Sequence, residues 1–244
     1  MVLKAASPVW LFDLDNTLHD AGPHIFPHIN RSMVEYIRDH LGIEEEEATR
    51  IRQVYWQRYG ATLLGMMRHH GTDARHFLWH THQFPDLKHM LVIERGLRAL
   101  LRRLPGRKLV FSNAPLCYSQ KVLELAGISA CFDAVYSIER IRFQPKPAVG
   151  GFRFLLRSES LSAHRCIMVE DVLSNLWTAK QLGMKTVWVS TATRQPAWVD
   201  VRVASILDLP RRMQRLWTPQ ASSRSIQACH DRAFSTAYQQ TSVW

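Results

Sequence analysis

The 244-residue sequence lacks the features that mark secreted, zinc-finger and membrane-spanning proteins. Its four cysteines, Cys117, Cys131, Cys166 and Cys229, include no Cys-x-x-Cys pair, which argues against a disulfide framework or a zinc finger. No apolar run reaches the roughly 18–20 residues that a membrane-spanning helix needs. The first residues lack the apolar stretch of a secretory signal. These absences predict a cytoplasmic protein with reduced thiols and no membrane partner.

Long runs of basic residues are also missing, although the net charge is +10. Such a balance favours anionic ligands through long-range attraction. Residues 211–244 carry five arginines against one acid, among Ser, Gln, Thr and isolated aromatics. This composition predicts a basic, polar and poorly ordered tail. Aromatic residues do not alternate with Lys and Arg densely enough for an RNA-binding segment, so no nucleic-acid partner is expected.

Short apolar segments alternate with helical segments over much of the chain. Strands are predicted at residues 9–13, 108–112, 132–136, 166–170 and 185–190. Helices are predicted at residues 94–104, 118–126, 148–159 and 173–182. Strands that alternate with helices of this length indicate a parallel sheet with helices on both faces. The expected fold class is therefore α/β, with a Rossmann-like core.

The segment after the first strand breaks this alternation, because no strand is predicted in residues 20–93. Ile29, Met33, Ile37 and Leu41 recur every fourth residue and define one apolar helix face. Further helices are predicted near residues 45–57, 60–70 and 73–82. We therefore expect an all-helical cap domain at residues 19–93, inserted into a core formed by residues 1–18 and 94–210.

Polar side chains follow the predicted strands at their C-terminal ends. Closely spaced carboxylates after a buried strand repel each other unless a cation is bound, and such a cation binds phosphate oxygens well. Open α/β sheets bind ligands at this edge, so side chains there should converge. The candidates are Asp13, Asp15, Ser112, Asn113, Lys146, Glu170 and Asp171. The pattern predicts metal-assisted phosphoryl chemistry.

Four short segments resemble the haloacid dehalogenase superfamily of aspartate-nucleophile phosphatases, over about residues 9–210. They are Asp-Leu-Asp-Asn-Thr at 13–17, Phe-Ser-Asn at 111–113, Lys-Pro at 146–147 and Glu-Asp-x-x-x-Asn at 170–175. Each segment alone has an ordinary explanation, such as a solvated turn or an acidic helix N-terminus. Their occurrence together, in order and at predicted strand ends, favours the functional interpretation.

The resemblance implies a role for each matching residue. Asp13 is the nucleophile that takes the phosphoryl group as an aspartyl-phosphate. Asp15 protonates the leaving oxygen and then activates the attacking water. Dehalogenating relatives lack this second acid, so its presence favours phosphate esters over haloacids. Ser112 donates a hydrogen bond to the phosphate, and Lys146 offsets negative charge on Asp13 and the phosphate.

The resemblance also implies a Mg²⁺ cofactor and further phosphate contacts. The metal is held by a carboxylate oxygen of Asp13, the backbone carbonyl of Asp15, and Asp171, with Glu170 as a further direct or water-mediated ligand. Thr17 and Asn113 are the remaining candidate substrate-binding residues of the core.

The predicted cap narrows the substrate class. Tyr59-Gly60-x-x-x-x-Gly65-Met66-x-x-x-His70-x-x-Asp73 resembles the cap of the pyrimidine 5′-nucleotidase branch. This branch hydrolyses nucleoside monophosphates such as UMP and CMP. Tyr59 and His70 are candidate substrate contacts, although both residue types also occur in helical cores. His19 departs from the aromatic residue that often follows the first loop.

Other functions remain open at this point. A capped phosphatase could act on a sugar phosphate or phosphoglycolate. A protein with the same fold could bind a ligand without turnover. His76 and His80, four residues apart, could share a helix face and bind zinc, although exposed polarity explains them as well. The sequence gives no indication of the oligomeric state.

Overall fold

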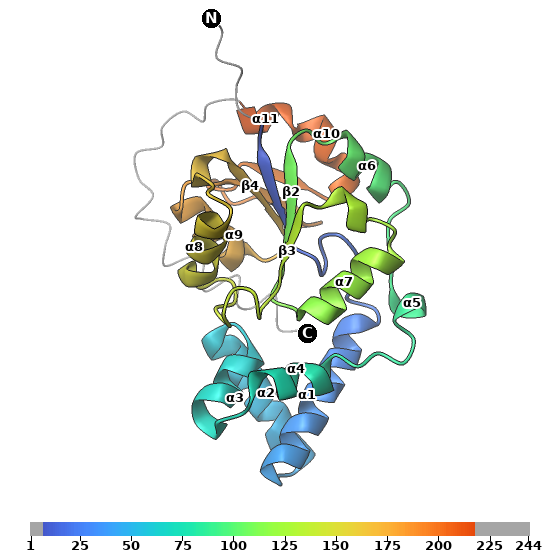
Figure 1. Ribbon diagram of the computed structural model, residues 1–244, viewed down its shortest axis with the longest axis vertical. Coiled ribbons are helices and arrows are strands. Elements are labelled where there is room, and N and C mark those ends of the chain that lie inside the picture. The colour runs from blue at the N-terminus through green and yellow to red at the C-terminus, as the bar shows by residue number, and fades with distance from the viewer. Residues whose placement is uncertain (1–6, 218–244) are drawn as a thin grey trace, which may run out of the picture.

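The computed structural model describes residues 7–217, and its core is a six-stranded parallel sheet (Figure 1). The strand order β3-β2-β1-β4-β5-β6 places β1 at the centre, between β2 and β4. This arrangement confirms the predicted α/β, Rossmann-like fold. The strands are β1 (Val9–Phe12), β2 (Arg107–Phe111), β3 (Ala134–Tyr136), β4 (Cys166–Glu170), β5 (Lys185–Val189) and β6 (Val201–Val203).

Helices bury both faces of this sheet, as continuous apolar strands require. Successive residues of a strand point to opposite faces. In β1, Trp10 and Phe12 accordingly pack into one cluster with α6 and α7, while Val9 and Leu11 pack into a second cluster with α8 and α9. These helices are α6 (Leu97–Arg103), α7 (Leu116–Leu125), α8 (Val149–Ser158) and α9 (Leu173–Gln181).

The chain between β1 and α6 forms a helical insertion, shown in Figure 1 beyond the end of the sheet. Ile29 and Ile37 are buried along its first helix, which confirms the predicted apolar face. We propose residues 19–93 as the bounds of this unit. None of the described helices is long and apolar enough to cross a membrane. The helices of the insertion are α1 (Ile25–Leu41), α2 (Glu45–Tyr59), α3 (Thr62–His70), α4 (Ala74–Thr81) and α5 (Leu87–Met90).

Two glycines of the segment that resembles a nucleotidase cap have packing roles. A Cβ atom at Gly65 would lie 2.1 Å from Cγ of Tyr55, so α2 and α3 approach closely only with glycine there. Gly60 ends α2 with a φ of +77°, a left-handed conformation that favours glycine. A Cβ atom at Gly60 would also lie 3.2 Å from Cδ of Pro147. The end of α2 therefore packs against the turn that carries Lys146.

Helices continue further along the chain than the sequence predicts. Residues 211–217 were expected in the poorly ordered tail, but α10 (Leu209–Arg212) and α11 (Gln214–Trp217) form there. Leu216 is 1% exposed and joins the cluster that covers one face of the sheet. The rest of the predicted tail, residues 218–244, lies outside the described residues. Strand β6 was also missed, because three residues carry too little periodicity to be recognised.

The burial of Leu216 predicts that two truncations will differ in stability. Deletion from residue 211 removes this leucine and should lower the free energy of unfolding by about 1.5–3 kcal/mol, the usual contribution of a buried leucine. Deletion from residue 218 leaves every described contact in place. Urea denaturation of the two truncated proteins measures the difference. Equal free energies of unfolding would show that Leu216 does not stabilise the core.

Candidate active site

Three carboxylates surround one lysine where β1 and β4 end. Asp13 follows β1, and its backbone N–H donates to the carbonyl of Val169 at 2.9 Å, next to Glu170 at the end of β4. One carboxylate oxygen from each of Asp13, Glu170 and Asp171 lies within 4.8 Å of the others. Lys146 Nζ donates to Asp13 Oδ1 at 2.7 Å and to Glu170 Oε2 at 2.6 Å. The structure thus brings these four predicted residues together.

The electrostatics of this cluster show a shortage of positive charge. Burial and the charge of Glu170 raise the pKa of Asp13 to about 8, against the opposing effect of Lys146. Burial and Glu170 also raise the pKa of Asp171 well above its ordinary value. Burial alone would lower the pKa of Lys146, but the charges of Asp13 and Glu170 outweigh it and raise this pKa. One protonated lysine therefore faces three carboxylates.

This donor set fits a hard divalent cation such as Mg²⁺, which prefers carboxylate oxygens. Within residues 7–217, it is the one group of three or more His, Cys, Asp or Glu side chains placed to hold a metal ion. His76 and His80 are therefore in no such group, although their rings lie 4.4 Å apart. A bound cation would also supply the positive charge that is missing beside Asp13 and Asp171.

Asp15 lies in a tight turn immediately after β1. Asn16 adopts a left-handed φ of 57°, a conformation that asparagine tolerates better than most residues. The backbone N–H of Leu18 donates to the carbonyl of Leu14 at 2.9 Å and closes the turn. This geometry places His19 Nε2 at 2.9 Å from Asp15 Oδ1.

A tyrosine from a neighbouring helix completes the surroundings of Asp15. Tyr118, in the first turn of α7, donates its hydroxyl to Asp15 Oδ1 at 2.6 Å. Burial alone would raise the pKa of Asp15, but the contacts with His19 and Tyr118 outweigh it and lower this pKa. The sequence did not single out Tyr118. Its position one turn into the helix after Ser112 and Asn113 was the available signal.

The remaining predicted core residues have separate roles at the sheet edge. Asn113 clamps the backbone of Lys146: its Nδ2 donates to the Lys146 carbonyl at 2.9 Å, and the Lys146 N–H donates to Asn113 Oδ1 at 2.8 Å. Ser112 is 1% exposed, and its Oγ accepts from the N–H of Ala114 at 3.0 Å. Thr17 Oγ1 is buried with no hydrogen-bond partner in the described structure, and this unsatisfied hydroxyl is suited to a ligand oxygen.

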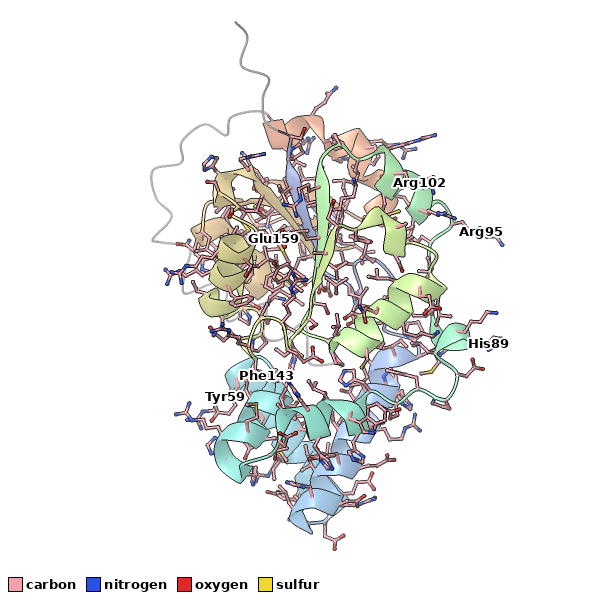
Figure 2. The ribbon with its side chains drawn as sticks, in the orientation of Figure 1. Tyr59, His89, Arg95, Arg102, Phe143 and Glu159 are labelled. Atoms are coloured by element: carbon pink, nitrogen blue, oxygen red, sulfur yellow. The ribbon has the colours of Figure 1, made fainter. Side chains whose placement is uncertain are left out.

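The two predicted cap residues make their described contacts within the insertion. The Tyr59 hydroxyl lies 2.6 Å from His69 Nε2, and His70 Nε2 lies 2.8 Å from the Tyr55 hydroxyl. Figure 2 shows Tyr59 at the edge of the insertion. The hydrogen bonds described for Tyr59 and His70 do not connect them to the carboxylate cluster.

Other aromatic side chains of the insertion meet the core close to Asp15. The rings of Phe84 and His82 lie 5.2 Å and 5.8 Å from that of Tyr118. Burial lowers the pKa of His82 to about 4, although the charge of Asp15 partly opposes it. These residues follow α4, outside the segment from which the sequence analysis chose its substrate contacts.

A parallel sheet with reactive side chains gathered at its carboxyl edge is the arrangement of an α/β enzyme. The sequence model of the haloacid dehalogenase-like hydrolase family matches residues 9–183, and the chain belongs to this family. This match confirms the resemblance found in the sequence and identifies the protein as a hydrolase.

Solved structures share the fold at low sequence identity. A HAD phosphatase from Thermococcus onnurineus has a TM-score of 0.61 and 20% identity, covering 84% of this chain and 97% of that chain. CbbY from Rhodobacter sphaeroides, in complex with phosphate, has a TM-score of 0.61 and 19% identity, covering 83% and 96%. An L-2-haloacid dehalogenase from Xanthobacter autotrophicus, with chloropropionic acid covalently bound, has a TM-score of 0.54 and 16% identity, covering 85% and 98%.

A curated relative is also similar in sequence. Phosphate metabolism protein 8 of Saccharomyces cerevisiae is 26% identical over 196 residues, which cover 73% of this chain. The aligned region spans 60% of that relative's length. The family and the fold are thus established, while the substrate has to be inferred from the site.

Proposed function

We propose that the protein is a Mg²⁺-dependent phosphomonoester hydrolase that forms an aspartyl-phosphate on Asp13. The observation that carries this proposal is the cluster of Asp13, Glu170 and Asp171 around Lys146. Mg²⁺, held by these carboxylates and the backbone carbonyl of Asp15, would supply positive charge that polarises the substrate phosphate. The remaining chemistry comes from side chains of this chain.

In the first step, a carboxylate oxygen of Asp13 attacks phosphorus while the bond from phosphorus to the ester oxygen breaks. Lys146 orients the attacking carboxylate through its 2.7 Å hydrogen bond and offsets charge on the transferred oxygens. The unpartnered Thr17 hydroxyl and the Ser112 hydroxyl are the proposed donors to phosphate oxygens.

Asp15 is the proposed acid and base of the two steps. It gives a proton to the leaving oxygen, and then takes one from the water that hydrolyses the aspartyl-phosphate. The described hydrogen bonds of Asp15 use Oδ1, which leaves Oδ2 for these transfers. To act as the acid, Asp15 has to hold a proton on Oδ2 when the substrate binds, and the contacts of His19 and Tyr118 with Oδ1 orient the carboxyl group for this transfer. Tyr118 fixes the carboxylate between the two steps.

The proposed substrates are nucleoside 5′-monophosphates, with UMP and CMP preferred. The resemblance of the segment that begins at Tyr59 to a nucleotidase cap supports this class. The rings of His82 and Phe84 support it independently, because they pack against Tyr118, the partner of Asp15, where the leaving nucleoside would depart. Aromatic side chains stack well on nucleobases.

A substrate panel tests this proposal directly. Phosphate release is measured with Mg²⁺ for UMP, CMP, AMP, a hexose phosphate and phosphoglycolate, with chloride release from 2-chloropropionate as a further control. We expect UMP and CMP to have values of kcat/KM at least about tenfold above the non-nucleotide esters. Preferred turnover of phosphoglycolate or a hexose phosphate would reassign the substrate. Chloride release without phosphate release would overturn the phosphatase proposal.

Removal of the metal should abolish turnover, and the apparent affinity for Mg²⁺ should depend on pH. Carboxylates must lose their protons to bind Mg²⁺, and the raised pKa of Asp13, about 8, keeps it protonated at lower pH. The apparent Mg²⁺ affinity should therefore fall between pH 8 and pH 6, by up to about tenfold per pH unit for each displaced proton. Mg²⁺ activation of EDTA-treated protein at several pH values measures this. The Asp171→Asn protein should need more Mg²⁺ at every pH, and activity that persists in EDTA would exclude the metal assignment.

A further inference from the structure

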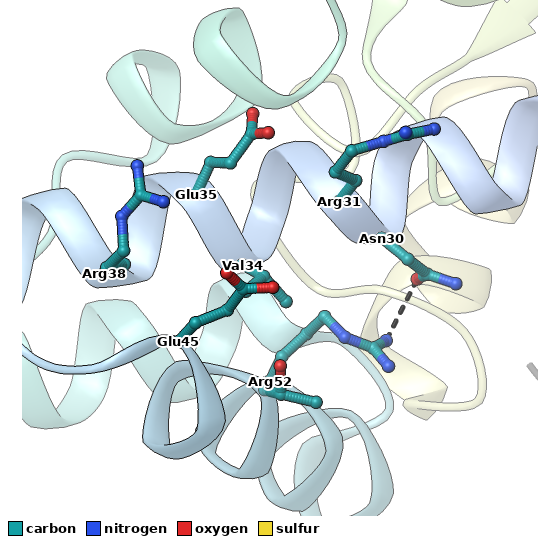
Figure 3. Close-up of a pocket in the computed structure, with 8 residues that line it drawn as sticks. Asn30, Arg31, Val34, Glu35, Arg38, Glu45 and Arg52 are labelled. Carbon is teal, nitrogen blue, oxygen red and sulfur yellow. Dashed lines mark hydrogen bonds between the residues drawn. The ribbon is translucent and has the colours of Figure 1, made fainter.

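A second polar site lies within the helical insertion, in a groove of about 350 Å³ between α1 and α2 (Figure 3). Every residue that lines the groove belongs to one of these two helices. The groove therefore shares no residue with the carboxylate cluster at the sheet edge. Its function has to be inferred from its own side chains.

The unusual residue of this groove is Arg52, a buried arginine for which residues 7–217 provide no acidic partner. Its side chain comes from α2, and the residue is 9% exposed. Its NH1 donates to Asn30 Oδ1 at 2.9 Å, while its buried Nε has no hydrogen-bond partner in the described structure. Burial lowers the pKa of Arg52. A buried charge is costly unless it is paired, so an arginine in this state is suited to an anionic ligand.

The charges that line the groove are divided between its two ends. In Figure 3, the carboxylates of Glu35 and Glu45 lie between Arg38 on one side and Asn30, Arg31 and Arg52 on the other. Asp39 raises the pKa of Arg38, with smaller contributions from Glu35 and Glu45. Both acids of the groove thus act on Arg38, and among the described residues neither forms an ion pair with Arg52.

We propose that the Arg52 end of the groove binds a small oxyanion, the phosphate or carboxylate group of a ligand. Asn30 Oδ1 accepts from Arg52 NH1, so the Asn30 NH₂ group and the unpartnered Arg52 Nε are the donors that remain at this end. Arg31, which is exposed, also lines the groove. This end offers N–H donors and positive charge, and a guanidinium fork matches the geometry of an oxyanion. The site goes beyond the proposed hydrolysis, because it requires neither the metal nor Asp13.

Calorimetric titration of the full-length protein with inorganic phosphate, in EDTA, tests this site. EDTA removes the Mg²⁺ that would draw phosphate to the carboxylate cluster, and comparison of the variants below assigns the binding that remains to the groove or to the cluster. We expect Arg52→Met to weaken phosphate binding by about tenfold or more, because hydrogen bonds from a charged donor are lost. Arg50→Met is the matched control: Arg50 is an exposed arginine of the same helix, paired with Glu47, and its loss should leave binding unchanged.

A second variant keeps the test informative if Arg52→Met folds poorly. Asn30→Asp has nearly the same shape and places a carboxylate beside the guanidinium of Arg52. This internal carboxylate should occupy Arg52 and abolish phosphate binding, while the thermal midpoint stays equal or rises. Titration with acetate in place of phosphate shows whether a carboxylate alone suffices.

Three results would overturn the proposal. The first is that the wild-type protein binds neither phosphate nor acetate in EDTA. The second is that folded Arg52→Met and Asn30→Asp proteins bind the anions as tightly as wild type. The third is binding of uncharged uridine that Arg52→Met removes, which would assign the groove to the nucleoside part of the substrate. None of these readouts requires turnover, so the site can fail while the proposed hydrolysis stands.

Discussion

Replacement of Asp13 by asparagine should reduce phosphate release by on the order of 10⁴–10⁶-fold, as expected when a covalent nucleophile is removed. The amide cannot form the aspartyl-phosphate, and no other described carboxylate takes the same position against Lys146 Nζ at the end of β1. Steady-state phosphate release from the best substrate of the panel measures the loss. Rapid quenching with labelled substrate should trap a phosphorylated wild-type protein and an unlabelled variant.

The stability of the same variant distinguishes lost chemistry from a lost fold. The folded-state pKa of Asp13, about 8, lies above its ordinary value of 3.8, so its ionisation opposes folding increasingly as the pH rises between these values. Without metal at pH 7, Asp13→Asn should therefore melt at the same temperature as wild type or higher. If the inactive variant also unfolded at a lower temperature, its loss of activity could be explained by a damaged fold and would not identify Asp13 as the nucleophile. An active Asp13→Asn protein would exclude Asp13 as the nucleophile.

Replacement of Lys146 by methionine should have the largest effect on stability. Lys146 is 2% exposed and hydrogen-bonds to two buried carboxylates, so its removal leaves Asp13 and Glu170 without a cation. Breaking a buried ion pair on one side costs about 3–5 kcal/mol. Urea denaturation in EDTA should show this loss in the free energy of unfolding. Added Mg²⁺ should restore part of it by supplying positive charge to the same carboxylates.

Two further variants show whether charge imbalance causes this loss. Combining Lys146→Met with Glu170→Gln removes one charge of each sign and should recover much of the stability. Lys121→Met removes an exposed lysine paired with Glu124 and should change the free energy of unfolding little. If the double variant were no more stable than Lys146→Met alone, lost packing of the lysine side chain would be the better explanation.

The sequence revealed most of the core because its signals are local. Five of the six strands are apolar runs, and the candidate nucleophile Asp13 and the candidate metal ligand Glu170 stand directly at strand ends. Parallel strands carry such residues to one edge, so their meeting follows from the fold class. The predicted helix face through Ile29 and Ile37 was confirmed for the same reason: periodicity records burial directly.

Contacts between distant segments were not predictable in this way. Tyr118 reaches Asp15 across 103 residues of sequence, and its place shortly after Ser112 and Asn113 was the one weak signal of this contact. The missing partner of Arg52 is also visible only after α1 and α2 have packed. Tyr59 was chosen by resemblance, but its hydroxyl lies 2.6 Å from His69. A motif shared with a family can reflect packing as well as chemistry. Gly65 is an example of packing, because it allows Tyr55 to approach closely.

The close approach of Gly60 to Pro147 links the end of α2, in the insertion, to the turn of the core that carries Lys146. Lys146, which hydrogen-bonds to the nucleophile, immediately precedes this proline. Asn113 hydrogen-bonds to the backbone carbonyl and N–H of the same lysine. A displacement of the insertion would therefore shift the backbone of Lys146, which positions the ammonium group against Asp13. Binding of the leaving group by the insertion would in this way be coupled, through Pro147, to the orientation of the nucleophile.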